Sequence, residues 1–173
     1  TRGPLATRRQ LKTFLETGEA VGFSSVMVAD HIVVPAKIES AYPYTVKGNF
    51  LSKGECMEQL TLMAFVAAAT ETLRIVSSVM IVPHRNPIMT AKSLATTDVL
   101  SEGRVTVGVG VGWMAEEFEA LYAPDFKARG KSTDEYIAIW KKLWTGEAVS
   151  HKGEFYSFDD LYCQPAPLQS PHP

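Results

Sequence analysis

The chain has 173 residues, of which 46% are hydrophobic and 21% charged, and its formal net charge is −2. These values are ordinary for one globular domain with a sizeable core, and the slight negative charge argues against nucleic acid or an anionic membrane as a partner. No apolar run approaches the ~20 residues that span a bilayer, and the two cysteines, Cys56 and Cys163, lack metal-ligand spacing. We therefore expect a cytoplasmic protein without a metal site.

Helical and strand-like patterns alternate along the first two thirds of the chain. An amphipathic helix is expected at 10–21, ended by Gly22, and a short β-rich strand at 24–29. A loop rich in Pro, Tyr and Gly follows at 32–53, and a loop of this length is usually functional or mobile. The next expected elements are a helix at 55–72, a buried strand at 73–82, a helix at 87–100 and a strand at 104–109.

The remainder is predicted to contain two helices, at 115–121 and 133–145, and a small hairpin at 148–158. Ser132 and Glu135 have the spacing of a capping box for the second of these helices. This box would place the helix start close to residue 133.

Strand–helix–strand units with right-handed crossovers build a parallel sheet. Two architectures fit a domain at 1–163, namely part of a (β/α)8 barrel and an open doubly wound sheet. The last segment, 164–173, carries four prolines and is expected to be an extended or disordered tail. In both architectures ligands bind at the carboxyl ends of the strands.

Special residues follow all three predicted strands at this end, as in a barrel active site. Asp30 and His31 follow the first strand, and a histidine exchanges protons near neutral pH. Asp30 either orients a ring or ligand group or caps the loop. Arg85, after the second strand, is expected to pair with a neighbouring carboxylate and fix its loop. Trp113, after the third, either stacks on a ligand or covers the mouth of the barrel.

Glycines at 108, 110 and 112 alternate with valines along the third strand. Glycine weakens a strand, so such a row marks a bulge or a close backbone approach. The spacing is GxGxG rather than the GxGxxG dinucleotide fingerprint, and it leaves sheet geometry and ligand contact equally open. No pattern of a serine hydrolase, a zinc enzyme or a nucleoside triphosphatase is present.

The chain resembles members of the bacterial luciferase-like monooxygenase superfamily, and is most similar to its branch of probable oxidoreductases dependent on coenzyme F-420. This resemblance covers nearly the whole chain and is most specific over 73–121. The shorter resembling segments are GFSSVMVADHIVVP (22–35), ESAYPY (39–44), RGKSTDEY (129–136), LWTGE (143–147) and QPAPLQSPHP (164–173).

The resemblance implies a (β/α)8 barrel that binds a flavin or deazaflavin at the carboxyl ends of its strands. It also implies that Asp30 and His31 lie in the active site. The family often has a non-proline cis peptide at the end of the third barrel strand, and the corresponding bond here is Ser78–Val79. The backbone at Gly110 and Gly112 is expected to approach the cofactor.

Two departures qualify the resemblance. Trp113 stands where sugar-phosphate dehydrogenases of the family have a glutamate that can serve as acid, which makes a sugar phosphate a poor substrate. The second departure is length, because a complete barrel needs ~250 residues and this sequence corresponds to strands two to four of eight. We expect two exposed sheet edges and an uncovered inner face, and either a longer protein or pairing with another chain, as in a homo-oligomer.

The leading functional hypothesis is hydride transfer between F-420 and a small organic substrate, with His31 assisting proton transfer near the ring. The alternatives are an FMN-dependent monooxygenase that uses dioxygen, and a non-catalytic protein that binds cofactor or serves in assembly. The expected substrate contacts are Trp113 and, on the long loop, Tyr42, Tyr44 and Phe50, which favour an apolar or aromatic molecule.

Overall fold

The computed structural model describes residues 6–50 and 52–171. Its elements are α1 (Arg8–Ala20), β1 (Ser25–Val28), α2 (Gln59–Ala69), β2 (Arg74–Ile81), η1 (Val82–His84), α3 (Pro87–Leu100), β3 (Val105–Gly110), α4 (Ala115–Ala120), η2 (Phe126–Ala128), α5 (Arg129–Leu143), β4 (Val149–Lys152) and β5 (Ser157–Leu161). Every strand and helix expected from the sequence is therefore present, with shifted ends.

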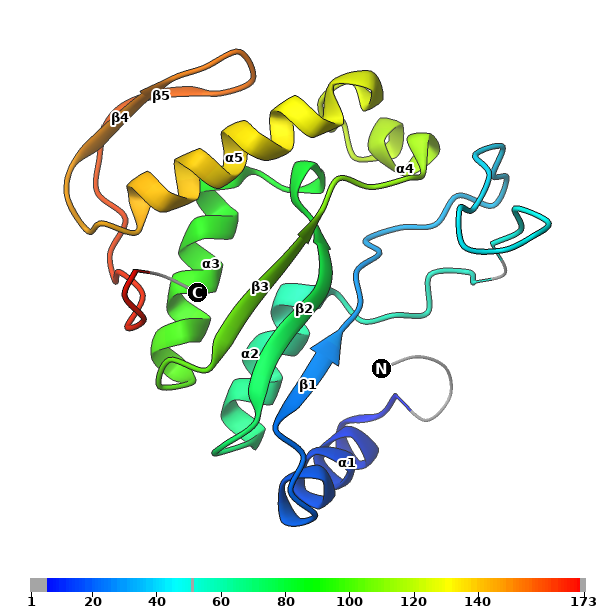
Figure 1. Ribbon diagram of the computed structural model, residues 1–173, viewed down its shortest axis with the longest axis vertical. Coiled ribbons are helices and arrows are strands. Elements are labelled where there is room, and N and C mark those ends of the chain that lie inside the picture. Colours follow the sequence, from blue (N-terminus) through cyan, green and yellow to red (C-terminus); the bar gives the residue numbers. More distant parts are fainter. Residues whose placement is uncertain (1–5, 51, 172–173) are drawn as a thin grey trace.

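The main sheet is parallel and has the strand order β1-β2-β3, so each strand pairs with the next one in the chain. Helices α2 and α3 connect these strands and pack together on one face of the sheet (Figure 1). This repetition is the pattern of consecutive units in a (β/α)8 barrel. The predicted fold class, α/β with a partial barrel, is confirmed.

The two faces of the sheet differ in their exposure. Val28, Ile75 and Val105 point toward the helices and are fully buried in the core. Met27, which precedes Val28 in β1, is 66% exposed, because no described element covers the opposite face. The uncovered inner face expected from the sequence is therefore present, and the alternation follows from the two-residue period of a strand.

Helix α5 begins earlier than predicted, and the proposed capping box is wrong. Ser132 lies buried within the first turn of α5, where its hydroxyl donates to the carbonyl of Arg129. The carboxylate of Glu135 instead accepts hydrogen bonds from three backbone N–H groups of the β4–β5 turn, at residues 154–156. Glu135 therefore binds the β4–β5 turn and does not cap the start of α5, although the local sequence pattern indicates a cap there.

The segment after β5 is irregular and is attached to α3 by hydrogen bonds. Asp98, buried on α3, accepts from the backbone N–H groups of Leu168 and Gln169 and from the Gln169 side-chain amide. The described part of the predicted tail is therefore fixed against the domain.

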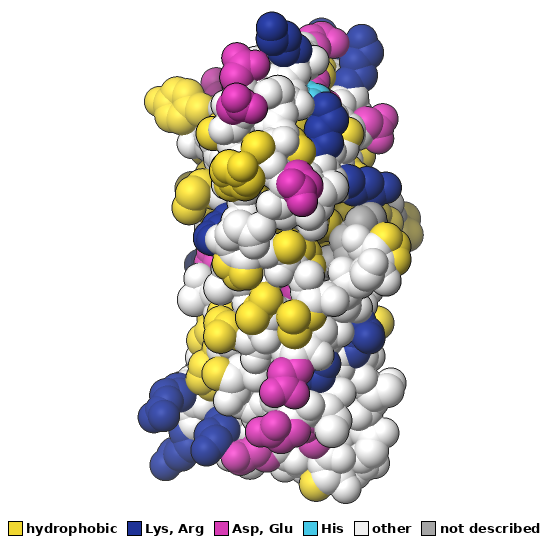
Figure 2. Space-filling view, turned by 90° about the vertical axis from the view of Figure 1, so that its left-hand side faces the viewer, with side chains coloured by type: hydrophobic (Ala, Val, Ile, Leu, Met, Phe, Trp, Pro, Cys, Tyr) yellow, Lys and Arg dark blue, Asp and Glu magenta, His cyan; other side chains and the backbone are white. Residues whose placement is uncertain are grey.

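Charged side chains of both signs are mixed on the side of the molecule that carries the hairpin and the chain's end (Figure 2). Hydrophobic side chains are scattered between them, mostly over the middle of that face. Among the described residues, no helix has the length and apolar character needed to cross a membrane.

The glycine row of β3 is required by a close approach to β2. The pairing of β2 with β3 shifts register between Ser77 and Met80, which brings the backbone of β2 toward β3 at Gly108. A Cβ atom on Gly108 would overlap the carbonyl oxygen of Ser77. Of the two interpretations of the glycine row, the packing of the sheet itself therefore explains Gly108.

We predict that Gly108→Ala lowers the free energy of unfolding by about 1–3 kcal/mol, because a backbone oxygen has to move to make room. Gly130→Ala is the matched control, since no atom lies within 4 Å of the added Cβ in the first turn of α5. It should be neutral or stabilise by about 0.4–1 kcal/mol. Urea denaturation measures both variants, and equal midpoints would contradict the close approach.

Candidate active site

A cavity of about 590 Å³ lies at the carboxyl ends of β1, β2 and β3. All ten site residues predicted from the sequence line it, namely Asp30, His31, Tyr42, Tyr44, Phe50, Ser78, Val79, Gly110, Gly112 and Trp113. The cavity also contacts two titratable residues that the sequence analysis did not assign to the site, His84 and Glu117. The structure thus brings the predicted residues together in one cavity. The contacts that each residue makes distinguish those held by protein groups from those that face the cavity.

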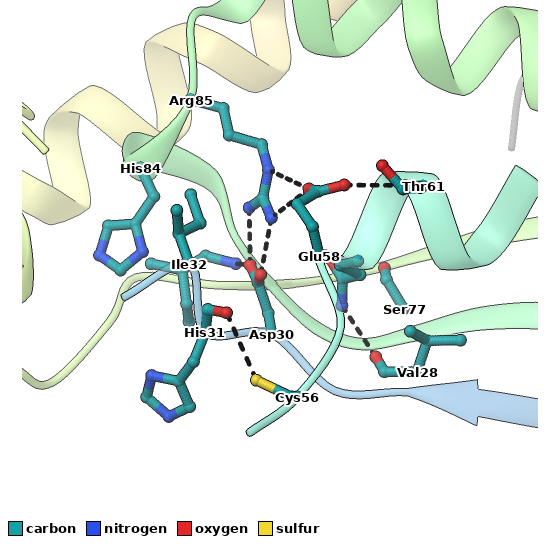
Figure 3. A network of polar contacts seen from close by, with 12 residues as sticks. Val28, Asp30, His31, Ile32, Cys56, Glu58, Thr61, Ser77, His84 and Arg85 are labelled. Carbon is teal, nitrogen blue, oxygen red and sulfur yellow. Dashed lines mark hydrogen bonds and ion pairs between the residues drawn. The ribbon is translucent and has the colours of Figure 1, made fainter. Parts of the chain in front are cut away.

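Asp30 belongs to a buried ion-pair network that joins three parts of the chain (Figure 3). Its two carboxylate oxygens lie 2.7 and 2.8 Å from the guanidinium nitrogens of Arg85, and the backbone N–H of Ile81 donates to the same carboxylate. Arg85 also donates to Glu58 at 2.9 Å. Glu58 caps α2 by accepting from the N–H of Thr61. The expected pairing of Arg85 with a neighbouring carboxylate is confirmed.

The charges of this network stabilise one another against desolvation. Burial by itself lowers the pKa of Arg85, but hydrogen bonds and attraction from Asp30 and then Glu58 raise it overall. Burial similarly raises the pKa of Glu58, and the hydrogen bonds from Thr61 and Arg85 outweigh this and lower it. Both groups therefore stay ionised at neutral pH, and the Asp30 carboxylate is occupied by protein partners.

His31 points away from the Asp30 network (Figure 3) and toward the cavity. Its Nδ1 lies 2.9 Å from the Oε2 atom of Glu117, whose side chain is 1% exposed. The other oxygen of Glu117 accepts from the backbone N–H groups of Ile32 at 2.9 Å and Val33 at 3.3 Å. Burial raises the pKa of Glu117, but the His31 hydrogen bond and the nearby histidines lower it overall.

His84 is the second histidine of the cavity, and its side chain is 2% exposed. Within the described part of the chain neither ring nitrogen has a hydrogen-bond partner, and the ring makes an edge-to-face contact with Phe118 at a centroid distance of 4.6 Å. Its Nδ1 lies 3.9 Å from Glu117, too far for a hydrogen bond. Burial lowers the pKa of His84 to about 4, so its ring is neutral at physiological pH.

A ledge of backbone and small side chains forms one wall of the cavity. The Ser78–Val79 peptide bond is cis, as the family resemblance implies. Gly110 lies against this bond, and a Cβ there would come within 2.6 Å of Val79. Gly112 has a φ of +85°, a conformation that favours glycine. Val79 itself is 44% exposed, so the ledge presents an apolar surface to the cavity.

Aromatic rings from the long loop and from the end of β3 form a second wall. Tyr42 and Phe50 lie 5.0 and 5.3 Å from the Trp113 ring, centroid to centroid, and 5.2 Å from each other. Tyr44 contacts Tyr42 from the outside and is 81% exposed. These distances are typical of tilted and edge-to-face aromatic packing.

The same loop is fixed to α4 by a second carboxylate. Glu116 accepts from the backbone N–H groups of Glu39 at 2.6 Å and Ser40 at 2.8 Å, and the Ser40 hydroxyl accepts from the N–H of Ala115. Burial raises the pKa of Glu116, but these hydrogen bonds lower it to about 2. The loop that carries the aromatic wall is therefore anchored by Glu116 and, at its start, by Glu117.

A sheet of consecutive barrel strands with one cavity at their carboxyl ends defines the general class of (β/α)8-barrel proteins. The sequence model of luciferase-like monooxygenases matches residues 2–173. The chain therefore belongs to the luciferase-like monooxygenase family.

Three similar proteins illustrate the range of this family. An uncharacterized protein of Mycobacterium tuberculosis is 36% identical over 156 residues, which cover 89% of this chain and 54% of the relative. The FMNH2-dependent dimethylsulfone monooxygenase of Pseudomonas putida is 37% identical over 67% of this chain and 32% of its own length. The solved structure of an F420-dependent secondary alcohol dehydrogenase has a TM-score of 0.73 and 22% identity, covering 95% of this chain and 47% of that one.

The chain thus spans about half the length of the curated relatives it matches. The similar proteins thus include one named as FMNH2-dependent and one named as F420-dependent, each acting on a small molecule.

We predict that the buried His84 makes stability depend on pH. Its folded pKa of about 4 lies below the usual value of 6.5, so the unfolded chain binds the proton more readily. Its contribution is therefore complete above pH 6.5 and is lost as the pH falls from 6.5 to about 4, which amounts to about 2–3 kcal/mol.

The measurement is the free energy of unfolding at pH 7 and pH 4.5. Because nearby Glu117, Asp30, Arg85 and His31 also act on this ring, the comparison uses His84→Phe in otherwise unchanged surroundings. This variant should lose less stability on acidification than the wild type. An identical loss in both proteins would show that His84 is not the titrating group.

Proposed function

We propose that this chain provides the ring-binding part of the active site of an F-420-dependent oxidoreductase, which transfers hydride between F-420 and a small organic substrate. The observation that carries the proposal is the position of His31 in the same cavity as the ledge at Val79. Family membership supports an oxidoreductase, and the cavity's contacts support the assignment of roles to its residues.

The cavity fits a flat ring system better than a charged chain. Its volume of about 590 Å³ lies within the usual range for small-molecule sites. Val79, Val109 and Val111 are each more than 40% exposed there, and the aromatic wall provides further apolar surface. None of the described residues that line the cavity is Lys or Arg, the side chains that commonly bind phosphate. We therefore assign the ring, and not the phosphate chain, to this cavity.

His31 is the residue best suited to exchange a proton in the cavity. The carboxylates of Asp30 and Glu117 are engaged in hydrogen bonds to protein groups, and burial keeps His84 neutral. Bound F-420 would supply the site for hydride transfer, while the chain supplies binding and orientation. In this proposal His31 holds the proton that accompanies the hydride, and Asp30 fixes the backbone from which His31 projects.

The substrate is proposed to lie between the ledge and the aromatic wall. Tyr42, Phe50 and Trp113 would pack on an apolar or aromatic molecule, with Tyr44 at the entrance. Trp113 occupies the end of β3 and presents no carboxylate there. An apolar or aromatic molecule fits these surroundings better than a sugar phosphate.

The second candidate is an FMN-dependent monooxygenase that uses dioxygen. Similarity to the FMNH2-dependent dimethylsulfone monooxygenase favours this candidate. The same cavity would hold either ring system, so cofactor identity decides between the two reactions.

The first test is titration of the protein with F-420 and with FMN, followed by the absorbance or fluorescence of each cofactor. Binding of F-420 but not FMN is the expected result. Selective binding of FMN would replace the proposal with the monooxygenase, and binding of neither by a folded sample would favour a non-catalytic role.

A substitution at His31 tests its chemical role. His31→Ala should reduce turnover on the order of 10²–10⁴-fold, the usual contribution of acid–base catalysis, while the cofactor's Kd changes little. His151→Gln is the matched control, because His151 lies in β4 and contacts Glu135 rather than the cavity. Parallel losses of turnover and cofactor affinity in His31→Ala would identify a structural histidine instead.

A further inference from the structure

We propose that Glu117 is the positioning residue that fixes the tautomer of His31, with the proton on Nδ1 and the lone pair of Nε2 available to a molecule in the cavity. The role of that lone pair in turnover rests on the proposed function, whereas the tautomer itself does not. Glu117 has no signal of its own in the sequence, and its assignment comes from the way three donors converge on one buried carboxylate.

The first step of the argument is the hydrogen-bonding capacity of Glu117. An ionised carboxylate accepts hydrogen bonds and cannot donate one. The pKa of Glu117 is lowered despite its burial, so the group is ionised at neutral pH. Its Oε2 lies 2.9 Å from His31 Nδ1, and this short contact requires a proton on that nitrogen. A neutral His31 therefore carries its proton on Nδ1.

The second step concerns the other ring nitrogen. His31 Nε2 has no hydrogen-bond partner among residues 6–50 and 52–171, and the ring lines the cavity with 12% of its side chain exposed. The neighbouring rings of Phe50 and Trp113 lie 5.0 and 6.5 Å from the His31 ring, centroid to centroid, and pack on it as aromatic contacts. Nε2 is thus the nitrogen that remains available to a ligand. Because it carries a lone pair in this tautomer, it can accept a proton or a hydrogen bond.

The third step is that Glu117 is itself held in place. Its Oε1 accepts from the backbone N–H groups of Ile32 and Val33, which immediately follow His31. These two amides are donors in every protonation state, so they require an oxygen at this position. One carboxylate therefore fixes both the His31 ring and the first residues of the loop that carries the aromatic wall.

This arrangement makes Glu117→Gln an unusually informative variant. The two backbone amides should retain the Gln oxygen at the Oε1 position, which turns the Gln amide nitrogen toward His31. An amide nitrogen donates, so His31 Nδ1 has to accept, and the ring proton moves to Nε2. The variant has nearly the shape of the wild type but inverts the tautomer.

The experiment is ¹⁵N NMR of ring-labelled histidine in the intact protein, with His31 assigned by comparison with His31→Ala. The pH is raised until the ring signals stop changing, so that the ring is neutral. Wild-type His31 should then show a protonated Nδ1 and an unprotonated Nε2, and Glu117→Gln should show the reverse. Glu116→Ala is the matched control, because it removes the neighbouring loop anchor without touching His31. It should keep the wild-type ring pattern.

Turnover with the cofactor found by titration is the second readout. Glu117→Gln should lower kcat on the order of 10²–10⁴-fold, as loss of the correct tautomer does in acid–base catalysis. A neutral wild-type ring with its proton on Nε2, or an unchanged tautomer in a folded Glu117→Gln, would overturn the assignment. If Glu117→Gln does not fold, the wild-type ring pattern alone decides. An inverted tautomer with unchanged kcat would instead overturn the role given to Nε2 and contradict the proton-transfer function of His31.

Discussion

The positive charge of Arg85 lies between two carboxylates that come from distant parts of the chain. Asp30 follows β1 and Glu58 begins α2, so this one side chain joins the end of a strand, the β2–α3 connection and the start of a helix (Figure 3). Removing a buried partner leaves an uncompensated charge, which is far more costly than an exposed ion pair. Because these contacts hold Asp30 in place, the backbone of the next residue, His31, is also held, and its side chain points toward the cavity.

The positions of the residues that line the cavity therefore depend on ion pairs and hydrogen bonds between protein groups. The side chains of Asp30 and His31 point in opposite directions. Asp30 points into the ion-pair network, and His31 points toward the cavity. On the ligand side, Glu117 fixes the ring of His31 and the start of the loop together. Two buried carboxylates thus orient neighbouring residues, and the cavity obtains its geometry from carboxylates that are already bonded to protein groups.

The order of elements could be predicted from the sequence because each strand is an apolar run and α3 has a clear cap at Asn86. Seven of the ten predicted site residues meet because parallel strands bring their carboxyl ends to one edge, and the loop after β1 brings the other three to the same cavity. Glu117 could not be predicted, since it lies 86 residues from His31 and its sequence, AEEFEA, is that of an ordinary solvated helix start. The first turn of α5 was misplaced for the same reason, because Glu135 serves a distant turn.

The loop anchors have one more property, which concerns how such a site can change. Glu116 and Glu117 hold the loop through its main-chain amides, at residues 32, 33, 39 and 40, and the Ser40 hydroxyl adds a contact to α4. None of these bonds involves the side chains of Tyr42, Tyr44 or Phe50. Replacement of those rings therefore leaves the path of the loop intact. Under the proposed function, the attachment of the loop is separate from the side chains that would contact the substrate, so new specificities could arise by exchanging those side chains while the loop stays in place.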